Sequence, residues 1–214
     1  MFRYILTAMV LAATVFAFLA SASAQSDDLP IVVIDVRNPM DQRLMDFIVE
    51  TISTTDAHLF VLRVDSPGIS SGDSGSMYRA VSEASAPVVV WVGDRPAVAF
   101  GGAASLLNVA DIGAAAPGTR IGYLQPTVVT GADAVPYRTS HDADGEESRD
   151  QLLDRSVVVE DPIPGYVDQV VPTIGQLIVG LDGTTVARGT DESQRVFELS
   201  TATATTLPDG SEVL

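Results

Sequence analysis

Three short, mostly apolar stretches recur at nearly equal intervals in the first half of the chain. They cover residues 31–36, 59–64 and 88–92, and their starts lie 28 and 29 residues apart. Nearly continuous apolar runs of this length are typical of strands that are buried on both faces of a sheet. Each interval leaves room for a helix, and strands that alternate with helices form parallel sheets. The spacing therefore predicts an α/β fold, with a largely parallel sheet flanked by helices.

Two amphipathic segments supply helices for this fold. Asn38 and Pro39 suit the N-cap and the first turn of a helix over residues 39–53. A second helix is predicted over residues 172–180. The residues expected to face the core are Met40, Leu44, Phe47, Ile48 and Ile52 in the first helix, and Ile174, Leu177, Ile178 and Leu181 in or next to the second. A buried Phe47 implies that Phe47→Ala costs about 3–5 kcal/mol in the free energy of unfolding.

Residues 87–123 have the features of an active-site scaffold. The buried strand is followed by a loop and by Gly101 and Gly102, which lead into a helix-like stretch of small residues. A turn over residues 116–119 contains Pro and Gly, the two residues that favour turns. Backbone N–H groups at the start of a helix can hold a developing oxyanion. The pattern indicates a site for carbonyl chemistry, if a nucleophile and a base are also present.

Several motifs in and around this stretch resemble the protease domain of the NfeD family, membrane-bound serine proteases of the ClpP class. The motifs are Asp-Ser-Pro-Gly at 65–68, the strand at 87–92, Ala-Pro-Gly-Thr-Arg-Ile-Gly at 116–122, and weaker matches at 165–168 and 181–183. Together they span about residues 30–187. The resemblance implies a spiral fold of the ClpP/crotonase type, which we expect to occupy residues 25–190.

The chain departs from this family at the positions that carry its chemistry. The resemblance implies a Ser–Lys dyad, and the motif spacing places the nucleophilic serine at Gly101, which has no side chain. Ile69 stands where the family loop has a second glycine. All 12 basic residues are arginines, which stay protonated and cannot act as a base. We therefore expect no catalytic residue, with Gly68 and Gly102 left as backbone groups that resemble an oxyanion hole.

Other residues could still provide a rearranged site. Ser105 lies one helical turn after Gly101, and Ser66 lies in the loop after the second strand, but either one needs a base beside it. His58 begins a buried strand and is expected to have a structural role, whereas His141 is expected to be exposed in a polar segment. We predict that no serine in the cleft has a base within hydrogen-bonding distance.

Two further sites are disfavoured. Residues 97–110 contain no carboxylate that could act as the base of a crotonase-like acyl-CoA site, and an exported domain would meet little CoA. Asp65 is better explained as a residue that fixes its loop than as a catalytic acid. Residues 139–155 are acidic and belong to a polar insertion expected over 131–162, but they lack the glycine and glutamate spacing of a calcium loop. We expect no metal and no cofactor.

The composition narrows the classes of partner. The chain has no cysteine, which excludes disulfides and thiolate metal sites, and a formal net charge of −16. This charge argues against binding to nucleic acid and against electrostatic binding to anionic lipid. A membrane protein of the stomatin type is the partner that the resemblance implies, and we also expect a homo-oligomer.

The two ends of the chain differ from its centre. Residues 1–24 combine an early arginine, an apolar run and an Ala-Ser-Ala sequence, as a cleaved secretory signal does. An uncleaved membrane anchor is the alternative, and both place the domain outside the cytoplasm. Residues 184–187 and 195–199 are expected to form a closing hairpin, and the chain from 191 to 214 to finish that hairpin and continue as a polar tail.

Two functions remain open from these residues. The first is an extracytoplasmic, membrane-associated domain of NfeD/ClpP type that is a non-catalytic pseudoprotease and acts by binding or assembly. The alternative is an active ClpP-class serine endopeptidase with a rearranged catalytic site. Labelling by a serine-reactive fluorophosphonate would separate the two.

Overall fold

A five-stranded parallel sheet lies at the centre of the molecule. The computed structural model describes residues 29–124, 143–189, 194–201, 205–206 and 212–213. The sheet has the order β1-β2-β3-β5-β8, and every neighbouring pair in it is parallel. Its strands are β1 (Ile31–Arg37), β2 (Leu59–Asp65), β3 (Val88–Val92), β5 (Ile112–Ala115) and β8 (Gln169–Val170). The three predicted strands are neighbours in this sheet, which confirms the α/β prediction.

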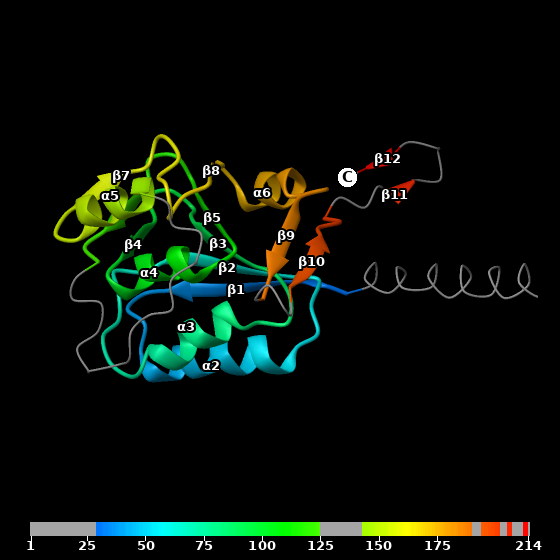
Figure 1. The fold of residues 1–214 in the computed structure, drawn as a ribbon, viewed down its shortest axis with the longest axis horizontal. Helices are drawn as coiled ribbons and strands as arrows, with labels where there is room; N and C mark the ends of the chain where they lie inside the picture. Colours follow the sequence, from blue (N-terminus) through cyan, green and yellow to red (C-terminus); the bar gives the residue numbers. More distant parts are fainter. Residues whose placement is uncertain (1–28, 125–142, 190–193, 202–204, 207–211, 214) are drawn as a thin grey trace, which may run out of the picture.

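The two faces of the sheet are covered differently (Figure 1). One face carries α2 (Gln42–Thr54), α3 (Gly75–Ser82) and α4 (Gly102–Val109). The other face carries α6 (Ile174–Gly180) and the antiparallel hairpin of β9 (Thr185–Arg188) and β10 (Arg195–Glu198). The predicted helix at 172–180 and the predicted closing hairpin are therefore both present.

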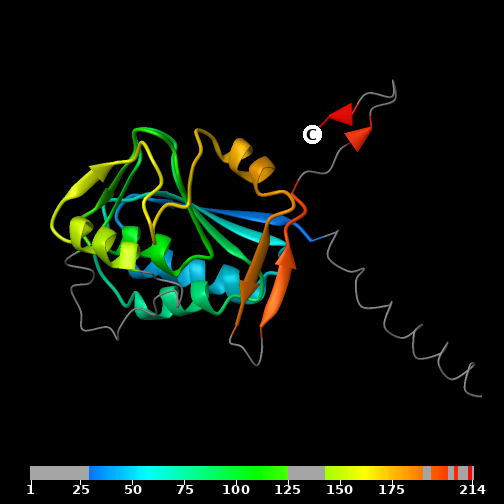
Figure 2. The ribbon, with the colours of Figure 1, turned by 45° about the horizontal axis from the view of Figure 1, so that its top comes forward.

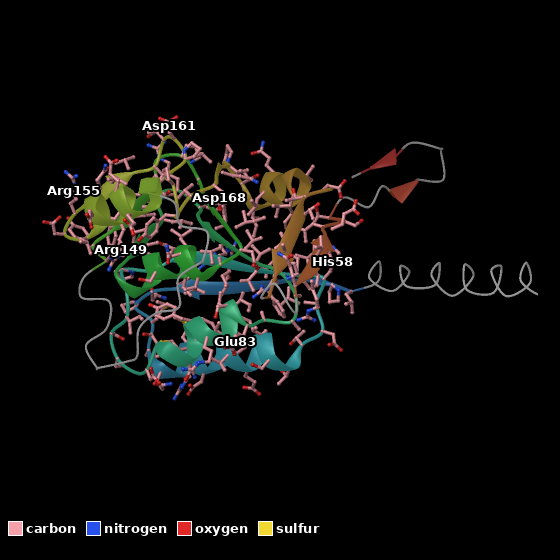
Figure 3. All side chains as sticks on the ribbon, in the orientation of Figure 1. His58, Glu83, Arg149, Arg155, Asp161 and Asp168 are labelled. Atoms are coloured by element: carbon pink, nitrogen blue, oxygen red, sulfur yellow. The ribbon has the colours of Figure 1, made fainter. Side chains whose placement is uncertain are left out.

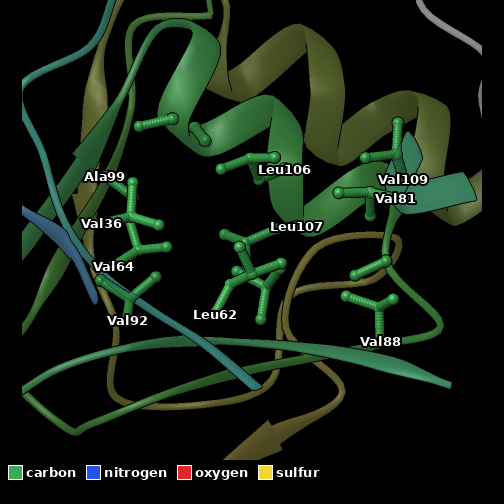
Figure 4. Close-up of a cluster of buried hydrophobic side chains, with 14 of the residues drawn as sticks. Val36, Leu62, Val64, Val81, Val88, Val92, Ala99, Leu106, Leu107 and Val109 are labelled. Carbon is green, nitrogen blue, oxygen red and sulfur yellow. The ribbon is translucent and has the colours of Figure 1, made fainter. Parts of the chain in front are cut away.

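The larger apolar core lies between the sheet and the three helices. Successive side chains of a strand point to opposite faces, so Leu62 and Val88 point towards the helices while their neighbours point away. They belong to one buried cluster with Val81 of α3 and Leu107 of α4 (Figure 4). This alternation explains why β3 is apolar at every position and why β2 is apolar at its first four.

The smaller core lies on the opposite face, under α6 and the hairpin. Trp91 of β3 is fully buried there, and its indole N–H donates to the carbonyl of Val171 at 3.1 Å. Leu177 and Leu181 are also fully buried in this core. The predicted burial of Leu177 and Leu181 is thus confirmed, whereas Ile174 and Ile178 are only half-buried.

A second, three-stranded sheet extends from the carboxyl end of the first. Its strands are β4 (Val98–Phe100), β6 (Arg120–Gly122) and β7 (Ser156–Val158), in the order β4-β6-β7. Within the segment expected as a polar insertion, residues 143–152 form helix α5, and β7 pairs with β6. Ser148 and Leu152 are buried on the inner side of α5. Gly145 is buried beside them, and these three residues dock the helix despite its acidic composition.

The hairpin and α5 lie at opposite ends of the central sheet (Figure 2). Two short strands, β11 (Thr205–Thr206) and β12 (Glu212–Val213), pair with each other within the segment expected to be a polar tail. Residues 1–28, which contain the expected signal, lie outside the described residues. None of the helices in the described part of the chain is long and apolar enough to cross a membrane.

The rotation of α2 about its axis differs from the prediction. Met45, Ile48 and Ile52 are its buried residues, Leu44 is half-buried, and Phe47 is 54% exposed. Phe47 and Ile48 are adjacent and therefore lie about 100° apart around a helix, so only one of them can face the core. The prediction that Phe47 is buried was wrong, and the associated cost of Phe47→Ala does not apply to it.

The start of α2 also differs from the prediction. The helix begins at Gln42, and Asp41 is its N-cap, with the Asp41 carboxylate accepting from the backbone N–H of Leu44 at 2.9 Å. Asn38 instead has φ 65°, a left-handed conformation that asparagine tolerates better than most residues. The expected Asn38–Pro39 start therefore forms the turn that ends β1.

Candidate functional site

A sharp strand–turn–helix junction places Gly101 between β4 and α4. Gly101 has φ 54° and ψ −126°, and a residue with a side chain is strained at such a positive φ. Its N–H donates to the carbonyl of Gly122 at 3.0 Å, and its own carbonyl accepts from the N–H of Ser105 at 3.2 Å. The junction is buried and held on both sides. A nucleophile elbow has the same local form, with a serine at the turn.

The loop after β2 lies directly beside this junction. Ser66 donates its N–H to Val98 at 2.7 Å, and the N–H of Phe100 donates to Ser66 at 3.1 Å. Gly68 has φ 124°, which favours glycine, and a Cβ placed on it would lie only 3.1 Å from the carbonyl oxygen of Phe100. The Asp65 carboxylate accepts from the N–H of Val98 at 3.0 Å. Asp65 therefore fixes the loop, as expected, and the Gly68 loop faces the start of α4.

The two backbone groups proposed for an oxyanion hole are in different situations. The N–H of Gly68 donates to the Ser66 hydroxyl at 3.2 Å, and the Gly68 carbonyl accepts from the N–H of Met40 at 2.9 Å. Gly102 is the first residue of α4, a position whose N–H has no partner within the helix. A hole made of both donors would require the N–H of Gly68 to leave Ser66.

Two side chains fill the space around Gly102. A Cβ on Gly102 would collide with Ile69 Cδ1 and would lie 2.7 Å from the hydroxyl oxygen of Tyr78. Ile69 is the residue that stands in place of a glycine in the NfeD-like loop, and its side chain packs against the larger core. The substitution at position 69 therefore closes space at the helix start.

Tyr78 is a large polar side chain in contact with this junction, and sequence reasoning missed it. Its hydroxyl donates to the carbonyl of Gly102 at 2.8 Å. Burial raises the pKa of Tyr78 to about 12, and the nearby hydroxyls of Ser74 and Ser105 lower it by a smaller amount. Tyr78 is therefore protonated at neutral pH and acts as a hydrogen-bond donor. No sequence motif marks it, because the contact joins α3 to α4.

The serines near the junction are engaged with the backbone. Ser105 is 7% exposed, and its hydroxyl lies 3.4 Å from the Gly101 carbonyl oxygen, a long hydrogen bond. The Ser66 hydroxyl lies 3.3 Å from the Gly68 carbonyl oxygen. Neither hydroxyl has a hydrogen bond to a histidine or a carboxylate among the residues that the structure describes. The arrangement orients both hydroxyls towards structural partners.

The two histidines do not complete a site with these serines in the described structure. His58 precedes the amino end of β2, whereas the Ser66 loop follows its carboxyl end, about 23 Å away for a seven-residue strand. His58 Nε2 accepts from the N–H of Ser200 at 3.0 Å, beside the hairpin (Figure 3). This hydrogen bond fits the structural role expected of His58. His141 lies outside the described residues.

A separate hollow of about 230 Å³ lies between α5 and β7. Its lining combines Gln151 of α5 and Val158 of β7 with Glu160 and Asp161 from the loop that follows. The lining contains no histidine and no lysine. Among the residues that the structure covers, no group of three or more histidine and carboxylate side chains could hold a metal ion.

Comparison with solved structures identifies the fold. A mutant of a membrane-bound stomatin-specific protease, in complex with a substrate peptide, matches with a TM-score of 0.63 and 14% identity over 82% of this chain and 90% of that chain. A protease from Pyrococcus horikoshii, specific for a stomatin homolog, matches with a TM-score of 0.56 and 15% identity over 81% and 88%. The enoyl-CoA hydratase/carnitine racemase homologue of Magnetospirillum magneticum matches with a TM-score of 0.52 and 23% identity over 66% of each chain.

These similarities establish a fold of the ClpP/crotonase type, as the sequence resemblance implied. No known sequence family matches the chain, and no curated protein matches it. At identities of 14–23% the likeness concerns the path of the backbone and says nothing of the side chains at the junction. The chemistry of Gly101 and its neighbours has to be argued from the residues themselves.

Proposed function

We propose that the chain is an NfeD-type domain of ClpP fold that does not hydrolyse peptides. We place it outside the cytoplasm and at the membrane, where it acts by binding or assembly. The observation that carries the proposal is Gly101, a residue without a side chain, at the strand–helix turn where the motif spacing places the family's nucleophile.

The missing groups cannot be replaced by their neighbours. Covalent catalysis by a hydroxyl needs an activating base within hydrogen-bonding distance. The chain has no lysine, Tyr78 stays protonated at neutral pH, and the hydroxyl of Ser105 points to a carbonyl. A site that lacks both nucleophile and base keeps at most the weak catalysis that binding alone supplies. Binding without turnover is the function that this chemistry supports.

The surface beside the junction suits an apolar peptide. Phe100 and Tyr123 flank the Gly101–Gly122 contact and pack edge to face, with ring centroids 5.3 Å apart. Tyr123 is 44% exposed, so its ring is available to a ligand. We propose an apolar segment of a stomatin-type membrane protein as the partner, because two of the structural neighbours are proteases specific for stomatin or a stomatin homolog. We also propose that the chain forms a homo-oligomer.

The test is to treat the purified protein with a fluorophosphonate probe and to assay it on casein and on apolar peptides. We expect neither labelling nor turnover, and we expect Gly101→Ser to stay inactive because no base is restored. A heat-unfolded sample controls for non-specific labelling. Labelling of the folded protein that Ser105→Ala or Ser66→Ala abolishes would contradict the proposal and would establish the alternative, a serine endopeptidase with a rearranged site.

Binding is measured separately from hydrolysis. Apolar peptides from the sequence of a stomatin-type membrane protein are titrated against the protein and against Tyr123→Ala. We expect the substitution to weaken binding, since it removes an exposed ring beside Gly101. Val196→Ala is the matched control, because Val196 is exposed on the distant hairpin. Equal affinities for the three proteins would contradict a peptide site at this junction.

A further inference from the structure

Strand β1 forms an open edge of the central sheet. It pairs with β2 over all seven of its residues, and no other strand of the described chain pairs with its outer side. Its first four residues, Ile-Val-Val-Ile, carry no charge, and Val33 is 46% exposed. Natural proteins usually protect such an edge with charges, proline or a covering element, because its free N–H and C=O groups can pair with another chain. The amino-terminal half of β1 lacks this protection.

An uncharged stripe runs along α2. It consists of Leu44, Phe47, Thr51 and Thr54, whose spacing places them on one side of the helix. Phe47 is 54% exposed. The hydroxyls of Thr51 and Thr54 donate to the carbonyls of Phe47 and Glu50, at 2.7 and 2.8 Å, so these side chains use their polar atoms within the helix. The stripe is therefore effectively apolar.

The stripe lies on the same flank of the molecule as the open edge. On the opposite side of α2, the Gln42 side chain accepts from the N–H of Asp73 at 2.8 Å, in the loop that leads into α3. The sheet order places α3 towards β3, so the other side of α2 faces beyond β1. The partly buried Val32 and Leu44 pack against the same core at this border. Edge and stripe together form one surface, which we call the β1–α2 flank.

We propose that the β1–α2 flank is the surface through which two copies of this chain form a symmetric dimer. The two β1 strands pair antiparallel around a two-fold axis at Ile34, and the two α2 helices pack against each other at Phe47. When the two-fold axis is perpendicular to the sheet, side chains that point to one face in one copy point to the same face in the other. The apolar side chains that alternate along β1 therefore stay on the faces that each core covers. Because each copy has a five-stranded central sheet, the two sheets together form one sheet of ten strands.

The charges on the flank favour a second copy over another partner. Arg43 and Glu50 are exposed and lie four residues before and three residues after Phe47, both on the solvent side of the stripe. Antiparallel helices that cross at Phe47 bring Arg43 of each copy to Glu50 of the other, which makes the surface self-complementary. On β1, Asp35 already forms a two-point ion pair with Arg63, at 2.6 and 2.8 Å. Two copies that each carry a net charge of −16 repel each other, so association is favoured at a surface where positive and negative side chains pair.

This inference rests on the proposed assembly role and gives that role a surface. The test is sedimentation velocity of the purified protein over a range of concentrations. We expect a dimer whose dissociation constant rises at least about tenfold in Phe47→Asp and in Val33→Asp. Phe47→Asp places a charge in the helix contact, and Val33→Asp places a second carboxylate opposite Asp35 of the other copy, where like charges repel. Val196→Asp is the matched control, because it adds a charge at a residue that is 66% exposed on the hairpin. Circular dichroism melts check that all variants remain folded.

Charge exchange provides the sharper test. Arg43→Glu alone and Glu50→Arg alone should each weaken the dimer, and the double exchange should restore it, because the reciprocal pair is formed again in the opposite sense. A protein that is monomeric at every concentration would overturn the proposal. So would a dimer that Phe47→Asp and Val196→Asp weaken equally, or a monomer whose residues 31–37 gain hydrogen-exchange protection only with an added peptide. Fluorophosphonate labelling of the same samples tests the non-catalytic assignment independently of the dimer.

Discussion

The polar side chains buried at the two ends of the central sheet differ in charge. At the amino ends of β3 and β5, the chain buries a charged pair, Arg188 and Asp111. At the carboxyl end, around Gly101, the buried polar groups are neutral hydroxyls. Among the described residues, a buried charged pair is thus found at the amino end, where it joins separate elements, and neutral hydroxyls are found around Gly101.

The charged pair connects segments that are far apart in the sequence. Arg188 Nη1 donates to the Asp111 carboxylate at 2.6 Å and to the Ala86 carbonyl at 2.8 Å. Its Nη2 donates to the carbonyls of Val81 and Ser82, at the end of α3. Burial lowers the pKa of Arg188, and the charge of Asp111 opposes this shift. Every contact joins the hairpin to the larger body of the domain.

The neutral hydroxyls all serve nearby backbone. Tyr78 donates to Gly102, Ser105 to Gly101, and Ser66 interacts with Gly68. Activation of a hydroxyl would require a base that these hydrogen bonds do not supply. Buried polar side chains in this protein are therefore not by themselves a sign of catalysis. Their partners decide the role.

The largest effect is expected at the charged end. Arg188→Met should lower the free energy of unfolding by about 3–5 kcal/mol, because it removes the positive charge that faces the partly buried carboxylate of Asp111. Arg195→Met is the control, since Arg195 is exposed and its stacking on Phe197 should contribute no more than about 1 kcal/mol. Urea denaturation measures both. Equal losses would mean that the buried pair does not hold the hairpin.

The neutral end should respond to alkaline pH. The folded-state pKa of Tyr78 is about 12, above the ordinary value of 10.0, so the folded protein holds this proton more tightly than the unfolded chain does. The contribution of this raised pKa to the free energy of unfolding is complete below pH 10 and is lost as the pH rises through 12. The loss amounts to about 3 kcal/mol for a shift of this size.

The measurement is the free energy of unfolding in urea between pH 9 and pH 12, for the protein and for Tyr78→Phe. We expect the steeper decline in the unmodified protein, since the variant has no proton to lose at this position. Parallel curves would show that Tyr78 ionises without hindrance, and that the junction is more open to water than its burial indicates.

Adding a side chain at the junction should be costly and should bring no activity. Gly101→Ser places a side chain at φ 54°, where strain typically costs about 1–3 kcal/mol. Urea denaturation measures the cost, and Gly175→Ser is the control, because a Cβ there would meet no atom within 4 Å. If Gly101→Ser hydrolysed peptides, a base would have to lie within its reach, and the contrast between the two ends of the sheet would fail.

The strands could be predicted from the sequence because a strand that is buried on both faces is a continuous run of apolar residues. β2 and β3 lie between two apolar cores, so nearly every residue in them is apolar. The sequence indicates less clearly which side of α2 faces the core. The adjacent residues Phe47 and Ile48 allow two apolar stripes, and packing against the sheet selected the one that contains Met45. Periodicity alone could not choose between them.

The site was predictable only as far as it is local. The motif spacing indicated the position of Gly101, and the structure places it at the expected kind of junction. The contact of Tyr78 with Gly102 spans 24 residues, and the pair of Arg188 with Asp111 spans 77. Contacts over such separations follow from the packing of whole elements, and a single sequence contains no pattern that reports them.

The smallest effect is expected at Ser105, the serine closest to the junction in sequence. Its hydroxyl makes one long hydrogen bond, 3.4 Å to the Gly101 carbonyl, which also accepts from the N–H of the same residue at 3.2 Å. Ser105→Ala removes the weaker of the two bonds and keeps the backbone bond. The carbonyl therefore stays satisfied, and the cost should be below about 1 kcal/mol.

The same variant decides what kind of group Ser105 is. A structural hydroxyl predicts that Ser105→Ala melts within a few degrees of the unmodified protein and that fluorophosphonate reactivity is the same in both. Ser66→Ala is the matched comparison, because the Ser66 hydroxyl is fully buried and also accepts from the N–H of Gly68 at 3.2 Å. Its removal should therefore cost more than the loss of the Ser105 hydroxyl. If Ser105→Ala instead left stability unchanged and abolished labelling, Ser105 would be a nucleophile, and charge at the carboxyl end would have to come from residues outside the described structure.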